Sequence, residues 1–304
     1  MLTVFIPSYN HSDFVLETIR EALNIPVKDK LLYVIDDCST DDSVDKITKY
    51  IAEYDHKKEI NFIVKDKNYG VVDSLNKCLN YCDTEFIYLM ASDDIVIGKQ
   101  LAQIVNIMYR NSDLQFVVAG GMNLFMDGSE SHIYSKVHER FFNLPATKRT
   151  KELYLNCPSP ILSQSSVIRT SALKSIGGWD ESLVADDYAM FIKLLSRFSE
   201  KDKDFLYLPK DICVKYRHHD GNSYKKLLRQ YKVAFQTLDK LTPEKIKQKA
   251  LANKLGFYMA ICFKRRDFNT LYRLMILAPK THWLRGGFMV IKYFYSGLRN
   301  KCNL

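Results

Sequence analysis

The sequence lacks the features that mark secreted, membrane-spanning or repetitive proteins. Its first residues lead directly into an apolar segment, with no basic region or cleavage site ahead of it, so we expect no secretion. No internal repeat or low-complexity stretch is present. The apolar run over residues 287–295 is interrupted by Lys292 and is too short to span a bilayer. These absences favour a globular protein of the cytoplasm.

The seven cysteines do not form a recognisable metal site. Cys78 and Cys82 have the i, i+4 spacing of a helix, but no second pair and no nearby histidine accompanies them. Reduced, buried thiols of a cytosolic protein are the simpler interpretation.

Acidic residues are scarce in the C-terminal part of the chain. Residues 223–304 contain 18 Lys and Arg but 3 Asp and Glu, whereas the rest contains 26 basic and 32 acidic residues. The formal net charge of +9 therefore combines an acidic first part with a basic second one. We expect one domain over residues 1–222 and a basic helical extension over residues 223–304.

Strand and helix patterns alternate through the first half. Apolar runs predict strands over residues 2–6, 31–35, 60–64 and 86–90, and a further apolar run covers residues 116–119. Amphipathic spacing predicts helices over residues 14–24, 43–54, 71–81 and 98–110. This alternation is typical of βαβ units and a largely parallel sheet.

Further along, the regularity weakens. Residues 127–150 are polar and predict loops. We expect a helix from about Asp187, short strands over residues 206–208 and 212–214, and a helix from Tyr224 onward.

Two carboxylate pairs, Asp93-Asp94 and Asp186-Asp187, lie about 90 residues apart where a β/α fold positions chemistry. The first follows a predicted strand, and open α/β sheets bind ligands at the carboxyl ends of strands. Adjacent acids there suit a hard divalent cation that also holds phosphate. The second opens an amphipathic segment, where a carboxylate can accept a proton. A solvated turn and a helix N-cap are the alternative interpretations of the two pairs.

Seven short stretches stand in a recognisable order. They are Phe5–Asn10, Val34–Asp41, Asn68–Gly70, Ser92–Asp94, Gly177–Glu181, Asp186–Tyr188 and Tyr216–Asn222. Together they resemble the family 2 inverting glycosyltransferases, and the resemblance covers roughly residues 1–223. It implies the α/β fold called GT-A, with a mostly parallel, Rossmann-like sheet that binds nucleotide-diphospho-sugars.

The resemblance implies a donor site at the strand ends. The Tyr9 ring would pack on the base, and Asp37 would accept a hydrogen bond from it. The remaining nucleotide contacts would come from Pro7, Asn10, Asn68, Gly70, Ser92, Asp93, Arg217 and His219. Mn²⁺ or Mg²⁺ would be held by Asp93, Asp94 and His219, and Arg217 would neutralise phosphate. The family often has an acid two residues before Asp93, where this chain has Ala91.

The resemblance also implies the acceptor side. Asp187 would be the general base, with Asp186 in support. Trp179 and Asp180 would join Asp186 around the acceptor, although Trp179 also fits a buried aromatic. A UDP-sugar would donate its sugar to a hydroxyl of a saccharide or a lipid-linked oligosaccharide in cell-surface polysaccharide assembly, with inversion.

Two other functions fit the sequence less well. A sugar-phosphate nucleotidyltransferase would carry a glycine-rich loop after the first strand, and Pro7–Asn10 contains no glycine. A catalytically silent protein that binds sugar nucleotides or membranes would not need Asp93 and Asp187, and both are retained.

The basic extension combines Lys and Arg with aromatic residues. This suits helices that lie in the membrane interface against anionic lipid, and it predicts a peripheral protein on the cytoplasmic face of the inner membrane. A helical extension that packs its apolar face on the core is the alternative. No nucleic-acid-binding module is visible, so we expect no nucleic-acid partner.

Overall fold

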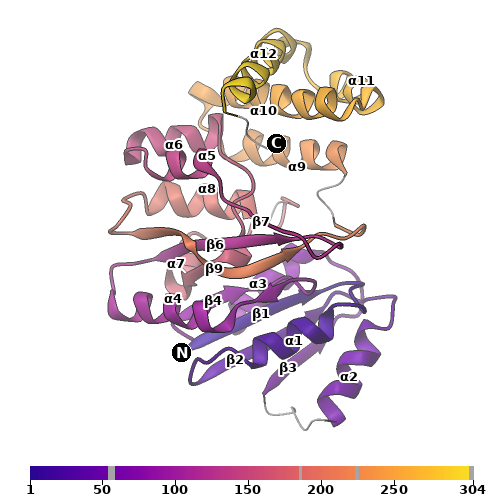
Figure 1. The fold of residues 1–304 in the computed structure, drawn as a ribbon, viewed down its shortest axis with the longest axis vertical. Helices are drawn as coiled ribbons and strands as arrows, with labels where there is room; N and C mark the ends of the chain where they lie inside the picture. The colour runs from indigo at the N-terminus through magenta and orange to yellow at the C-terminus, as the bar shows by residue number, and fades with distance from the viewer. Residues whose placement is uncertain (54–58, 185–186, 223–225, 301–304) are drawn as a thin grey trace. The chain divides into compact units, whose positions relative to one another are not determined.

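The structure is a computed structural model that describes residues 1–53, 59–184, 187–222 and 226–300, with side chains as far as Tyr295. The chain divides into two compact units, and most of their helices and strands are labelled in Figure 1. Unit 1 contains residues 1–146 and 158–219, and unit 2 contains residues 147–157 and 220–304. The segment 147–157 therefore belongs with the C-terminal helices, although it lies inside the first domain expected from the sequence.

The first half of unit 1 is a parallel sheet with connecting helices. The strands follow the order β3-β2-β1-β4 and are β1 (Leu2–Ser8), β2 (Lys30–Asp36), β3 (Ile60–Val64) and β4 (Phe86–Leu89). The helices are α1 (Val15–Leu23), α2 (Ser43–Glu53), α3 (Val71–Tyr81) and α4 (Gly98–Arg110). The predicted alternation is confirmed, and the carboxyl ends of β1, β2 and β4 lie at one edge of the sheet.

Strands of mixed direction complete the sheet, which continues from β4 in the order β8-β6-β9-β5. These strands are β5 (Ile95–Val96), β6 (Phe116–Leu124), β7 (Glu130–His132, paired with β6), β8 (Ser166–Arg169) and β9 (Phe205–Arg217). β8 lies antiparallel between β4 and β6, whereas β6 and β9 run parallel. The two short strands expected near residues 206–214 are thus one strand.

The length of β9 depends on a close approach to β6. The register between the two strands shifts at Gly120 and Gly121. A Cβ at Gly120 would lie 2.4 Å from the carbonyl oxygen of Pro209, so only glycine fits there. Past this irregularity β9 runs on to Arg217, which delivers His219 to the edge where β4 ends.

The loop prediction for residues 127–150 is wrong, because this region contains β7, α5 (Lys136–Phe142) and the start of α6 (Ala146–Leu155). Ser135 and His138 form a capping box at the start of α5, and Phe141 and Phe142 are buried. The buried side chains of α5 are too few to show a helical period in the sequence of this polar stretch. Unit 1 also contains η2 (Ser163–Ser165), α7 (Thr170–Ser175) and α8 (Asp187–Arg197).

Unit 2 is helical and has its own core. Its C-terminal elements are α9 (Leu227–Leu241), α10 (Glu244–Arg265), α11 (Phe268–Leu277), η4 (Lys280–His282) and α12 (Trp283–Asn300). Tyr231, Leu255, Leu274 and Val290 meet in this core. Among the described residues no helix combines the length and the apolar character needed to cross a membrane.

Candidate active site

Side chains at the ends of β1 and β2 tie the two following loops together. The buried Asp36 accepts hydrogen bonds from the Ser8 hydroxyl (2.8 Å) and from the backbone N–H of Ser39 (2.7 Å). Asn10 adopts a positive φ of 54°, which Asn tolerates well. Its N–H donates to the Ser39 hydroxyl, and its side-chain oxygen accepts from the N–H of Thr40. This leaves the neighbouring Tyr9 ring exposed at the strand ends, where the sequence predicted a base contact.

Asp37 is buried, and both of its carboxylate oxygens are already engaged. One accepts from Lys65 Nζ (2.8 Å) and from the N–H of Tyr69 (2.9 Å), and the other from the N–H of Gly70 (2.7 Å). Gly70 has a φ of 90°, and its N–H also donates to the side chain of Asn68. In this structure Asp37 therefore fixes the loop over residues 68–70, and its contact with a nucleotide base stays a prediction.

Lys65 was not foreseen from the sequence and is central to this loop. Its side chain is 1% exposed, and Nζ lies 2.8 Å from Asp37 and 2.7 Å from Asp73.

Lys65→Met would leave the buried charge of Asp37 without its cation, so we expect a loss of about 3–5 kcal/mol in the free energy of unfolding by urea. Lys77→Met is the matched control, because Lys77 also pairs with Asp73 but is 41% exposed, and it should cost less than about 1 kcal/mol. Equal losses in the two variants would contradict the role given to Lys65.

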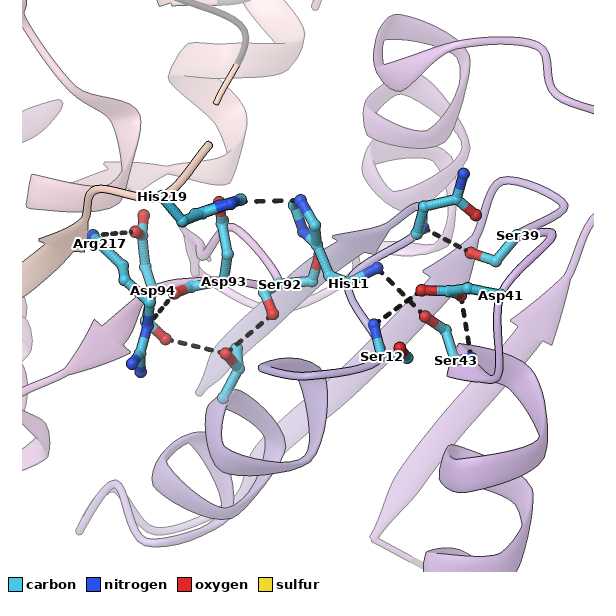
Figure 2. A network of polar contacts seen from close by, with 12 residues as sticks. His11, Ser12, Ser39, Asp41, Ser43, Ser92, Asp93, Asp94, Arg217 and His219 are labelled. Carbon is cyan, nitrogen blue, oxygen red and sulfur yellow. Dashed lines mark hydrogen bonds and ion pairs between the residues drawn. The ribbon is translucent and has the colours of Figure 1, made fainter. Parts of the chain in front are cut away.

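Three loops bring His11, Asp93 and His219 together at the strand ends (Figure 2). Their ligand atoms all lie within 4.8 Å of one another. His219 Nε2 is 2.8 Å and His11 Nε2 is 3.8 Å from the same oxygen of Asp93. A carboxylate and two imidazoles at this spacing can hold a divalent cation. The sequence predicted Asp93 and His219, whereas His11 was missed although it directly follows the stretch Phe5–Asn10.

The His11 ring is held in place by its neighbours. Nδ1 lies 2.8 Å from the Ser92 hydroxyl, which leaves Nε2 facing Asp93. Burial, the largest cause, and the nearby His219 lower the pKa of His11, against the opposing charge of Asp93. The neutral imidazole is the form that binds a metal ion. Ser92, predicted to contact the nucleotide, thus acts in this structure as a positioning residue for His11.

Asp94 is not part of this three-residue group, although it was predicted as a metal ligand. Its side chain is fully buried, and one oxygen accepts a hydrogen bond from the N–H of Arg217 (2.9 Å). Burial raises the pKa of Asp94 well above its usual range, and the charges of Asp93 and Asp187 add to the effect. Asp94 therefore joins β9 to the loop after β4.

The Arg217 side chain also faces protein groups. Nε donates to the carbonyl oxygen of Asp93 (2.9 Å), and the guanidinium pairs with Glu17 and lies over the Phe14 ring. From α1, the Thr18 hydroxyl donates to the carbonyl oxygen of Asp94 (2.9 Å). These contacts tie the loop that carries Asp93 to α1 and β9, and the contact of Arg217 with phosphate stays a prediction.

Asp187 is the first residue of α8, and its carboxylate accepts a hydrogen bond from the N–H of Ser163 (3.2 Å). A helix N-terminus favours an ionised carboxylate. Since its charge acts on the pKa of Asp94, Asp187 lies in the same region as the group of His11, Asp93 and His219. Asp186 lies outside the described residues.

Trp179 and Asp180, the other two residues predicted to contact the acceptor, lie in different surroundings. Trp179 is 3% exposed, and its backbone is held by the side chain of Asn76. Its ring is therefore interior, as the buried-aromatic alternative expected, and offers no face to a sugar in this structure. Asp180 accepts hydrogen bonds from the N–H and hydroxyl of Ser182 in a turn, and its contact with an acceptor stays a prediction.

Sequence comparison places this site in a known context. Residues 3–177 match the sequence model described as Glycosyl transferase family 2. An uncharacterized glycosyltransferase of Rickettsia typhi is 26% identical over 312 residues, which cover 98% of this chain and 91% of that protein. Chondroitin synthase of Escherichia coli is 24% identical over 258 residues, which cover 83% of this chain but 35% of the synthase. The chain thus spans about a third of the length of that relative.

Solved structures with low sequence identity have a similar fold. Residues 1–349 of S. aureus TarS, in complex with UDP-GlcNAc, are 17% identical with a TM-score of 0.59, over 84% of this chain and 71% of that one. A mannosyltransferase from Pyrobaculum calidifontis, in complex with GDP-Man and Mn²⁺, is 14% identical with a TM-score of 0.57, over 99% and 88% of the two chains. At these identities the likeness concerns the fold alone.

Proposed function

Because the chain belongs to glycosyl transferase family 2 and has the α/β GT-A fold, we propose that it moves a sugar from a nucleotide-diphosphate donor to an acceptor hydroxyl with inversion. The observation that supports this most directly is the group His11, Asp93 and His219 at the strand ends, in the same unit as Asp187. The residues that would bind the donor diphosphate and the residue that would deprotonate the acceptor thus belong to the same unit.

The proposed donor is a UDP-sugar. The exposed Tyr9 ring and the loop held by Asp37 flank the strand ends, where the base would lie. The similarity in fold to a transferase bound to UDP-GlcNAc supports this choice, and that to a transferase bound to GDP-Man makes a GDP-sugar the first alternative. The relation to chondroitin synthase supports a saccharide acceptor in polysaccharide assembly, and a lipid-linked oligosaccharide is the other acceptor proposed.

The group of His11, Asp93 and His219 fits a divalent cation, and its ligand types favour Mn²⁺ over Mg²⁺. Mg²⁺ prefers oxygen ligands and retains water, whereas this group offers two imidazole nitrogens and one carboxylate. When bound, such an ion would neutralise the charge of the departing diphosphate. Ser92 orients His11 for this purpose, and Arg217 holds the loop of Asp93.

Asp187 is the proposed general base. Its carboxylate takes the proton of the acceptor hydroxyl, and the acceptor oxygen attacks the anomeric carbon. The bond from that carbon to the diphosphate oxygen breaks, and the electron pair leaves with the diphosphate. A single displacement of this kind inverts the configuration at the anomeric carbon.

The proposal is tested by a thermal-shift screen of UDP- and GDP-sugars with Mn²⁺ or Mg²⁺, followed by turnover assays with saccharide acceptors. We expect Mn²⁺-dependent stabilisation by a UDP-sugar and release of UDP that depends on the acceptor. Nucleotide binding without any release of nucleotide would show a silent binding protein. Pyrophosphate formed from UTP and a sugar 1-phosphate would show a nucleotidyltransferase instead.

A further inference from the structure

Unit 2 displays an unusual number of exposed apolar side chains. Among the described residues, nine large hydrophobic side chains are more than 60% exposed, and seven of them lie on α11 and α12. These seven, called here the apolar face, are Phe268, Tyr272, Ile276, Leu284, Phe288, Ile291 and Tyr295. Monomeric soluble proteins rarely expose large contiguous apolar patches to water, so we expect the apolar face to contact another protein or a membrane.

The spacing of the apolar face places it on one side of each helix. On α11 its members recur at i, i+4 and i+8, and on α12 at i, i+4, i+7 and i+11. Other residues of the same helices, Leu274, Met289 and Val290, are buried, and Leu274 and Val290 belong to the core of unit 2. Packing on a core therefore accounts for the inner sides of α11 and α12 and leaves their outer sides unexplained.

A cavity of about 430 Å³ lies at the junction of the two helices. Its walls include Tyr272 and Ile276 of the apolar face, together with Ala278, Lys280 and Trp283. Small-molecule sites usually have volumes of about 300–1,000 Å³. A largely apolar cavity with one exposed lysine matches the chemistry of a lipid, which joins an apolar chain to a phosphate.

The charges around the apolar face are almost all positive. Residues 257–295 contain seven Lys and Arg and one acid, Asp267. Asp267 accepts a hydrogen bond from the N–H of Thr270 and caps α11. The exposed basic residues are Lys264, Arg265, Arg266, Arg273, Lys280 and Lys292. Aromatic side chains flanked by Lys and Arg are typical of helices that lie in the membrane interface.

We propose that the apolar face docks on an anionic lipid bilayer, with the surrounding Lys and Arg on lipid phosphates and the cavity beside Lys280 around the part of one lipid chain that adjoins its phosphate. A second copy of this chain is the less favourable occupant, because it would bring two strongly basic surfaces together. This inference goes beyond the proposed transfer reaction and does not depend on it. If both hold, docking brings the enzyme to the surface where a lipid-linked acceptor resides.

Vesicle sedimentation of the full chain tests the proposal without any donor or acceptor. The protein should sediment with vesicles of phosphatidylcholine and phosphatidylglycerol, and only weakly with phosphatidylcholine alone. Leu284→Glu with Phe288→Glu should weaken binding to the anionic vesicles about tenfold or more, because the change removes two apolar side chains from the bilayer and adds two negative charges beside anionic lipid. Tyr109→Glu with Met126→Glu is the control, since both residues are similarly exposed but lie in unit 1.

A second pair of variants isolates the charges. Neutralising Lys264, Arg265 and Arg266 to Gln should weaken binding to anionic vesicles by about tenfold or more. The same change at Lys28, Lys99 and Lys203, which are exposed in unit 1, should have little effect although the net charge is identical.

On binding, the fluorescence of Trp283 should shift to the blue, and Trp283→Phe should abolish that shift, because Trp179 is already buried.

Three results would overturn the proposal. Equal losses in the test and control variants would mean unspecific electrostatic adsorption. Unchanged binding in all variants would mean that the apolar face does not touch lipid. A dimer that becomes a monomer with Leu284→Glu and Phe288→Glu, while vesicle binding persists, would make the face an interface between copies.

Discussion

Asp187→Asn is expected to lower kcat by about 10²–10⁴-fold, the usual contribution of general-base catalysis. The substitution keeps the shape of the side chain and removes its capacity to accept the acceptor proton. Donor affinity should stay within about threefold, because the side chain is assigned to the acceptor rather than to the nucleotide. Steady-state kinetics with a UDP-sugar and calorimetry of nucleotide binding measure the two quantities separately.

Two further variants locate the base. Asp186→Asn should lower kcat less than Asp187→Asn, because Asp186 is assigned to support the site. Asp180→Asn should act on the KM for the acceptor more than on kcat. If Asp186→Asn is the inactive variant and Asp187→Asn turns over normally, the base is the preceding residue. If neither variant slows turnover, the proposed reaction itself is wrong.

The parallel half of the sheet could be predicted from the sequence because each strand is an apolar run followed by an amphipathic helix. β3, α3 and α4 begin and end where the pattern predicted. Such segments are long enough for their hydrophobic period to be visible. The carboxyl ends of the strands, and therefore the general location of Asp93, followed from the same pattern.

The other half could not be read in this way. β5 has two residues and β8 has four, so neither displays a period that could separate a strand from a loop. Their positions depend on antiparallel pairing with β9 and with β4 and β6, and these contacts are remote in the sequence. The capping box of α5 was missed because its third position is a histidine instead of the usual Glu or Gln.

The candidate site shows a similar limit. Asp93 and His219 were predicted because the resemblance assigns a role to their positions, whereas His11 directly follows the stretch Phe5–Asn10 at a position to which no role was assigned. Lys65 lies 28 residues from Asp37, and only the pairing of β2 with β3 brings the two together. In the structure Ser92 contacts His11 and Asp94 accepts from the N–H of Arg217, and the sequence could not show these contacts, because it does not tell whether a polar side chain holds a neighbouring residue.

Asp93→Ala is expected to abolish Mn²⁺-dependent binding of UDP while leaving the fold intact. Asp93 is the carboxylate that both His11 and His219 face, and its replacement removes the charged ligand of the group. Calorimetry of UDP binding with and without Mn²⁺ measures the effect, and circular dichroism checks the fold. Asp66→Ala, at an exposed acid in the same unit, is the control and should leave the affinity unchanged.

Variants of Ser92 and His11 should weaken Mn²⁺ binding to different degrees, which tests whether Ser92 acts by orienting His11. Ser92→Ala should weaken Mn²⁺ binding by about 10–100-fold, as expected when a residue that orients a metal ligand is lost. His11→Ala should weaken it at least as much. Since Ser92 acts through His11, the double variant should bind Mn²⁺ no more weakly than His11→Ala alone. Additive losses would show that Ser92 acts independently of His11, and unchanged Mn²⁺–UDP affinity in Asp93→Ala would show that the metal site lies elsewhere.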